Sequence, residues 1–85
     1  MSELEKQFAA AQTAAKALAS KPDNDTLLEL YSYFKQATDG DVGAAKPGAF
    51  DFVARAKYDA WEARKGMTKE VAMRGYIKLV AHLQE

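Results

Sequence analysis

Apolar residues recur every three or four positions in four separate stretches of this 85-residue chain. That period is typical of an α-helix that buries one face. The stretches are separated by residues that favour turns, and the longest separator, residues 39–48, contains three glycines and one proline. The sequence therefore predicts an all-α protein with four helices. We place them at residues 3–18, 22–38, 51–65 and 68–84.

Residues that favour helix ends stand close to these boundaries. Ser2 has the spacing of a capping box with the glutamate three positions later, and Thr68 can cap the fourth helix. Pro22 suits the first turn of the second helix. Gly40 and Gly66 follow the second and third helices, where a glycine can adopt a positive φ and end the helix. These residues indicate that the four stretches are separate helices.

Composition limits the class of protein. The chain has 48% hydrophobic residues and is long enough for one domain with a single core. Its 12 basic and 12 acidic residues cancel, which argues against binding nucleic acid or an anionic membrane through net charge. It contains no cysteine, no run of about 20 apolar residues and no basic-then-apolar leader at its start. We therefore expect a monomeric, cytoplasmic, single-domain protein over residues 1–85, with no nucleic-acid partner and no stable membrane insertion.

The residue types needed for catalysis or metal binding do not form a recognisable group. His82 is the only histidine, and we expect it on the surface near a helix end. The loop from Gly43 to Gly48 has P-loop spacing but lacks the lysine and hydroxyl residue that must follow. Asp39 begins a calcium-loop pattern, but the required glycine and the final glutamate are replaced. We therefore predict no enzyme activity, no cofactor and no metal site.

The second and third helices carry cations beside aromatic rings. Leu28, Tyr31 and Lys35 are spaced by three and four residues and form one file along the second helix. Lys57 and Trp61 are four residues apart on the third helix. Leu28, Tyr31 and Lys35 could simply form the edge of the core, where the aliphatic part of the Lys35 side chain covers apolar surface and its ammonium group reaches solvent. The file also suits a ligand with phosphates and a flat heterocycle, such as a nucleotide, because lysine meets the charge and rings stack on the base.

Several segments of the sequence are recognisable, because their residues, their order and their spacing match those of one known family. They read Leu-Tyr-Ser-Tyr-Phe-Lys-Gln-Ala-Thr-Asp-Gly-Asp at 30–41, Lys-Pro-Gly at 46–48 and Ala-Lys-Tyr-Asp-Ala-Trp at 56–61. Together with Ala-Met-Arg-Gly-Tyr-Ile at 72–77, they resemble the acyl-CoA-binding protein family over residues 8–83. The resemblance implies a four-helix bundle with up-down-down-up topology, which holds the acyl chain in a bowl and the coenzyme head group at its edge.

The resemblance also implies roles for particular residues. Aromatic and cationic residues would bind the coenzyme A head group: Tyr31, Lys35, Lys57, Tyr76, Phe34 and Lys16. Of these, Tyr31 and the lysines at 35 and 57 would hold the 3′-phosphate of the adenosine, and Tyr76 would pack near the adenine. Lys16 matches a cation near the phosphates. The acyl groove would be lined by Phe8, Gln12 and Leu28.

Three positions depart from the residues usual in that family. Phe34 replaces a tyrosine, so the ring can stack on adenine but has no hydroxyl to donate a hydrogen bond. Tyr58 replaces a tryptophan, and Gln12 replaces a small apolar residue and brings a polar amide to the acyl path. Gly75, inside the fourth helix, costs about 1 kcal/mol relative to alanine unless a close neighbour uses the missing side chain. We expect a core role for four residues at helical spacing: Trp61, Phe52, Leu79 and Val80.

From the resemblance we predict a non-enzymatic protein that binds, buffers and transports medium- to long-chain fatty acyl-CoA esters, with long-chain acyl-CoA as its partner. One alternative is a helical protein-interaction module whose apolar groove accepts an amphipathic partner helix. A third reading, an esterase or isomerase, has no nucleophile to support it.

Overall fold

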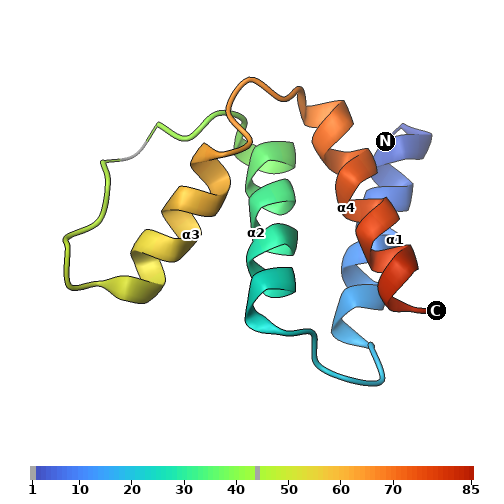
Figure 1. Cartoon of the computed structure of the whole chain (residues 1–85). Helices are drawn as coiled ribbons and strands as arrows, with labels where there is room; N and C mark the ends of the chain where they lie inside the picture. Colours follow the sequence, from blue (N-terminus) through green and yellow to red (C-terminus); the bar gives the residue numbers. More distant parts are fainter. Residues whose placement is uncertain (1, 44) are drawn as a thin grey trace.

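The computed structural model describes residues 2–43 and 45–85 and contains helices but no strands over those residues (Figure 1). The all-α prediction is therefore confirmed. The helices are α1 (Glu3–Lys16), α2 (Asn24–Asp39), α3 (Phe52–Glu62) and α4 (Lys69–Leu83). Within the described residues, no helix is both long enough and apolar enough to cross a membrane.

The four helices do not form a closed square bundle. Helix α2 lies between α3 and α4, and α4 also packs against α1 (Figure 1). Helices α1 and α4 run in one direction while α2 and α3 run in the other, which is the expected up-down-down-up topology. Although α1 and α2 are consecutive, their backbones make no close approach along the described residues. The arrangement leaves α2 accessible along one face, between α1 on one side and α3 on the other.

Capping side chains confirm some predicted helix starts and correct one. Ser2 Oγ accepts from Glu5 N at 3.1 Å and Ser2 N donates to Glu5 Oε1 at 3.0 Å, so the capping box at α1 is present. Thr68 caps α4 as expected. Pro22, however, lies before α2, because Asp23 takes the N-cap position and its carboxylate accepts from the Thr26 N–H at 2.8 Å. A capping residue has non-helical backbone angles, so the helix must begin after it.

Two helices end earlier than their apolar periodicity predicts. Helix α1 stops at Lys16, where Ala17 N donates to Ala14 O, three residues back. The segment after α3 tightens in the same way, with Arg64 N bonded to Trp61 O at 2.9 Å. Hydrogen bonds to the carbonyl three residues back are common at helix termini. Side chains in such a turn are spaced almost as in an α-helix, so apolar periodicity predicts a longer helix than the structure contains.

The end of α2 is tied to the turn between α3 and α4. Gly40 and Gly66 have φ of 81° and 91°, so both predicted glycine stops adopt the positive φ that favours glycine. Asp41 Oδ1 accepts from Gly66 N and from Gln36 Nε2, each at 2.8 Å. The bond from the Gly66 N–H, and then that from the amide, hold the pKa of Asp41 below its ordinary value of 3.8. Trp61 Nε1 donates to Gly40 O at 2.8 Å, which positions α3 beside α2.

The buried core comes from α1, α2 and α4. Its apolar members are Phe8, Ala11, Leu30, Ala37, Ala72, Tyr76 and Val80. Val80 is therefore core as predicted, Leu79 packs against the core from a partly buried position, and Trp61 is half-buried. The core prediction for Phe52 is wrong, because its side chain is 74% exposed. It is the first residue of α3, and α3 contributes no buried residue to the core.

Gly75 allows α4 to approach α2 closely. A Cβ at this position would lie less than 3 Å from three atoms of the Tyr33 ring. The Tyr33 ring also contacts the Arg64 guanidinium, whose carbon is 4.0 Å from the ring centroid. Arg64 Nε also donates to the buried Ser32 hydroxyl at 3.1 Å. The missing side chain is thus used by Tyr33, which is the close neighbour that would justify a glycine inside a helix.

Candidate ligand-binding site

Helical geometry distributes the predicted site residues over two sides of α2. Because successive residues turn by about 100°, Leu27 and Tyr31 lie near the middle of the accessible face. Leu28 and Lys35 are turned toward α3, whereas Phe34 is turned toward α1 and α4. The predicted site residues of α2 therefore border two different hollows, and the file of Leu28, Tyr31 and Lys35 lies as a whole on the α3 side.

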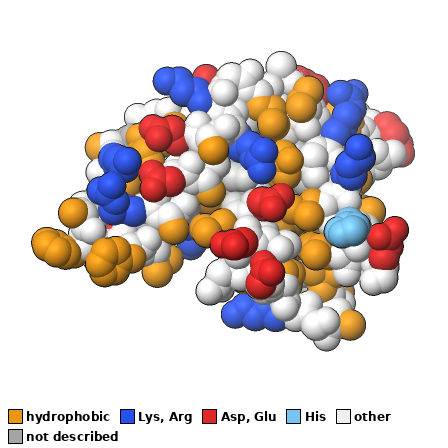
Figure 2. Space-filling model, in the orientation of Figure 1, with side chains coloured by type: hydrophobic (Ala, Val, Ile, Leu, Met, Phe, Trp, Pro, Cys, Tyr) orange, Lys and Arg blue, Asp and Glu red, His pale blue; other side chains and the backbone are white. Residues whose placement is uncertain are grey.

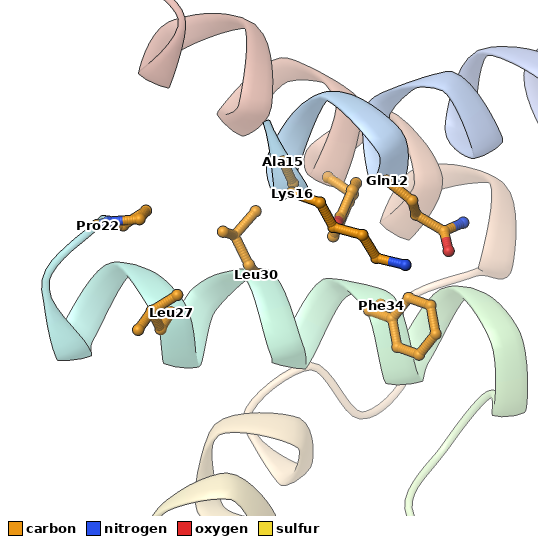
Figure 3. A pocket seen from close by; sticks show the side chains of 8 residues that line it. Gln12, Ala15, Lys16, Pro22, Leu27, Leu30 and Phe34 are labelled. Carbon is orange, nitrogen blue, oxygen red and sulfur yellow. The ribbon is translucent and has the colours of Figure 1, made fainter. Parts of the chain in front are cut away.

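The first hollow lies between α1 and α2, and we call it the α1–α2 hollow (Figure 3). It has a volume of about 340 Å³. Its walls are formed by Gln12, Ala15, Lys16, Pro22, Leu27, Leu30, Phe34 and Tyr76. Figure 3 shows the Lys16 side chain extending from α1 across the hollow toward Phe34, with the Gln12 amide on the same side. The hollow thus combines apolar walls with one ammonium and one amide.

Three aromatic rings pack together along this hollow. The Phe8 and Tyr76 ring centroids are 5.2 Å apart in an edge-to-face arrangement, and Phe34 lies 6.2 Å and 6.5 Å from them. Phe8 and Tyr76 are buried, while Phe34 is half-buried and lines the hollow. Burial raises the pKa of the Tyr76 hydroxyl, so the group stays neutral. Phe34 is therefore the ring best placed to offer its face to a ligand.

The second hollow, the α2–α3 hollow, lies on the other side of α2 and has a volume of about 380 Å³. It is lined by Asn24, Leu27, Leu28, Tyr31, Phe52, Val53, Ala56 and Lys57. Most of these residues are apolar, and Phe52 and Val53 are 74% and 69% exposed. Leu27 lines both hollows, so they meet across the accessible face of α2. A long ligand could therefore occupy both.

Two lysines flank the α2–α3 hollow in different electrostatic states. Lys57 Nζ lies 5.4 Å from the Tyr31 ring centroid and the residue is exposed. Lys35 Nζ lies 2.6 Å from Asp39 Oδ2 and 4.9 Å from the Trp61 ring centroid. The hydrogen bond to Asp39 raises the pKa of Lys35, so its ammonium stays charged. An anion near Tyr31 would therefore meet one exposed cation and one cation shared with a carboxylate.

The structure groups the residues predicted from sequence but divides them differently. Phe8, Gln12, Lys16, Phe34 and Tyr76 lie on the α1 side of α2. On the α3 side are Leu28, Tyr31, Lys35 and Lys57. Two residues assigned to one acyl groove, at positions 12 and 28, thus line separate hollows. Phe8 belongs to the buried core, although it also borders a third hollow beside Gln12.

Sequence reasoning missed several lining residues, among them Leu27, Pro22, Phe52 and Val53. Leu27 follows the same helical spacing as Tyr31, which is a signal that could have found it. For Phe52 and Val53 the sequence signal is weaker: two large apolar residues begin the third helix, and only the structure shows that no residue of that helix is buried. Figure 2 shows hydrophobic side chains gathered at the outer end of the molecule, where α3 begins.

The site offers binding groups but no cluster suited to a metal ion. Over residues 2–43 and 45–85, no three potential metal-ligating side chains come together. His82 lies at the end of α4 with its side chain 77% exposed, and its Nδ1 is 3.3 Å from Glu85 Oε2. The surface position expected for this histidine is confirmed. What the two hollows can do chemically is hold an apolar chain, a flat ring and a nearby anion.

Comparison with known proteins places the chain in a family. The family model described as Acyl CoA binding protein matches residues 5–80. Acyl-CoA-binding protein homolog 1 of Caenorhabditis elegans is 45% identical over 76 residues, which cover 89% of this chain and 88% of the relative. The crystal structure of Oryza sativa Acyl-CoA-Binding Protein 2 has a TM-score of 0.90 and 41% identity, covering 94% of this chain and 89% of that one.

An enzyme also contains a similar segment. Enoyl-CoA delta isomerase 2 of Rattus norvegicus is 43% identical over 79 residues, which cover 93% of this chain but 20% of the enzyme. The matches to the Caenorhabditis elegans and Oryza sativa proteins, by contrast, run along most of both chains. By family model, relatives and structure alike, the chain belongs to the acyl-CoA-binding protein family.

Proposed function

We propose that this protein binds medium- to long-chain fatty acyl-CoA esters, and buffers and transports them in the cytoplasm as a monomer. The observation that carries the proposal is the pair of hollows that meet across α2 at Leu27. One is apolar enough for an acyl tail, and the other offers an aromatic ring beside a cation. A ligand that joins a fatty tail to an anionic nucleotide suits both.

The acyl tail is assigned to the α2–α3 hollow. Its lining includes Leu27, Leu28, Phe52 and Val53, the last two of which are largely exposed. Each methylene that is buried contributes roughly 0.8 kcal/mol, or about a fourfold gain in affinity. The affinity should therefore rise with chain length until the hollow is filled. Phe52 was wrongly predicted to be a core residue, and its exposed side chain would instead contact this tail as part of the hollow's wall.

The head group is assigned to the accessible face of α2 and to the α1–α2 hollow. Tyr31, Lys35 and Lys57 would hold the 3′-phosphate, because two ammonium groups and a phenol flank this part of the face. The adenine would stack on Phe34, which is half-buried and lines the hollow. Lys16, directed toward Phe34 in Figure 3, would lie near the other phosphates.

We further propose that the protein does not react with its ligand. The match to the isomerase supports this reading, because the similar segment is a fifth of that enzyme. Among the described residues, the single histidine is largely exposed at the end of α4 and lines neither of the two hollows. The alternative of a protein-interaction module is not favoured, since the relatives matched over most of their length are named for acyl-CoA binding.

Isothermal titration calorimetry with palmitoyl-CoA tests the proposal. We expect saturation at one equivalent, tighter binding as the chain is lengthened, and recovery of intact thioester after incubation. Titration with free coenzyme A should give a much weaker signal, because the tail supplies most of the apolar burial. An absence of saturable heat with any chain length would refute the proposed function, and consumption of the thioester would refute the non-enzymatic part.

A further inference from the structure

Gln12 places an unused amide in the α1–α2 hollow. The residue is half-buried on α1 and lines both this hollow and the neighbouring one beside Phe8 and Met73. Among the side-chain hydrogen bonds of the described residues, none involves the Gln12 amide. A primary amide carries both a donor and an acceptor, so it can form two hydrogen bonds with one ligand edge.

The surroundings of this amide select a particular kind of ligand group. Lys16 follows Gln12 by one helical turn, so the two side chains leave α1 on the same face. Figure 3 shows both of them projecting over the hollow, opposite the Phe34 ring on α2. An aromatic face, an amide and an ammonium in one mostly apolar hollow fit a flat heterocycle that carries both donor and acceptor groups beside a phosphate.

We infer that Gln12 determines base specificity, by hydrogen bonding to the edge of the adenine of the ligand. This inference rests on the proposed function, which stacks adenine on Phe34. Adenine presents an exocyclic amino donor next to a ring-nitrogen acceptor, and glutamine pairs with this edge through two hydrogen bonds. A base lying flat on Phe34 directs its edge sideways, toward side chains from the facing helix. Phe34 itself has no hydroxyl, so it cannot supply such a bond.

The main competing contact for Gln12 is the pantetheine arm, whose two amides also carry donors and acceptors. The two contacts predict different results when the base alone is altered. The informative ligand pair is palmitoyl-CoA and its analogue in which the adenine 6-amino group is replaced by hydrogen. The pantetheine arm and the phosphates are identical in both esters, so only a contact with the base edge can distinguish them.

The informative variant is Gln12→Met, which keeps an unbranched side chain of similar length but removes both hydrogen-bonding groups. Its matched control is Gln7→Met, because Gln7 is an exposed glutamine on the same helix that lines the opposite groove, between α1 and α4. Circular dichroism and thermal unfolding should show both variants folded, since methionine is a good helix former. Calorimetry then gives the dissociation constants of the three proteins for the two esters.

The wild-type protein should bind palmitoyl-CoA about fivefold or more tightly than the 6-deamino analogue. Gln12→Met should weaken binding of palmitoyl-CoA by at least that factor, because it removes both hydrogen bonds, and should abolish the preference, whereas Gln7→Met should change neither. Equal losses for both esters would place Gln12 on the pantetheine arm and overturn the inference, as would unchanged binding by Gln12→Met. If the wild-type protein binds neither ester, the proposed function itself has failed, which is a different result from losing base preference.

Discussion

The strongest test of the head-group assignment is the substitution Lys57→Ala. Lys57 is exposed, its Nζ is 5.4 Å from the Tyr31 ring centroid, and it has no salt bridge with another described residue. Its ammonium can therefore bind a phosphate without first breaking an ion pair. A hydrogen bond to a charged group contributes about 1.5 to 3 kcal/mol, and exposure favours the lower value. We expect roughly tenfold weaker binding of palmitoyl-CoA.

The assay compares palmitoyl-CoA with its 3′-dephospho analogue in calorimetric titrations. If Lys57 binds the 3′-phosphate, the tenfold loss of affinity should shrink sharply for the dephospho ester, because that ester has no 3′-phosphate to which the wild-type Lys57 could bind. Lys35→Ala should show the same pattern with a smaller loss, because Lys35 is already bonded to Asp39 in the free protein. Lys78→Ala serves as the matched control, since Lys78 is an exposed lysine of α4 that lines neither the α1–α2 nor the α2–α3 hollow.

Two results would refute this reasoning separately. Equal losses for the two esters would show that Lys57 does not bind the 3′-phosphate. A larger loss for Lys35→Ala than for Lys57→Ala would show that the ion pair with Asp39 does not weaken the contribution of Lys35.

Three further predictions follow from contacts in the structure. Asp39→Asn should strengthen binding of palmitoyl-CoA, measured by calorimetry, because it releases Lys35 from a competing carboxylate; weaker binding would contradict this. Gly75→Ala should lower the free energy of unfolding by about 1 kcal/mol despite its gain in helix propensity, because the new Cβ meets the Tyr33 ring; in a Tyr33→Ala background the same change should become stabilising. The folded-state pKa of Asp41 is lowered, so its contribution to stability is present above its ordinary value of 3.8 and is lost as the pH falls through the folded value. Asp41→Asn should therefore flatten the decline of unfolding free energy below about pH 4, and an unchanged acid slope in chemical denaturation would count against it.

The helices could be predicted from sequence because their apolar spacing and caps act locally. Ser2 and Thr68 marked helix starts correctly, since a capping side chain bonds to a backbone group three residues away. Pro22 did not, because Asp23 competes for the same boundary and its carboxylate reaches the Thr26 N–H. The number and order of the helices thus depended on local chemistry, whereas their last turns depended on hydrogen-bond geometry that periodicity does not reveal.

The candidate site was predictable as a set of residues but not as an arrangement. The resemblance supplied Tyr31, Phe34 and Lys57, yet it did not show that α2 separates them into two hollows. That division arises because the backbone of α1 packs closely on α4 but stays away from that of α2, a long-range arrangement without a local sequence signal. Phe52 was misplaced for the same reason. An apolar residue at helical spacing can face either a core or a ligand, and only the tertiary arrangement decides which.

The same topology explains why so small a protein can form two hollows. Core residues come from α1, α2 and α4, whereas α3 packs on α2 alone among the helices, with the bond from Trp61 to Gly40 O beside that contact. Because α3 need not complete the core, its apolar residues Phe52 and Val53 remain available to a ligand. A conventional closed bundle would bury those faces against other helices and gain stability from them. Here Phe52 and Val53 of α3 do not pack in the core, and the proposed acyl tail would cover their exposed surface.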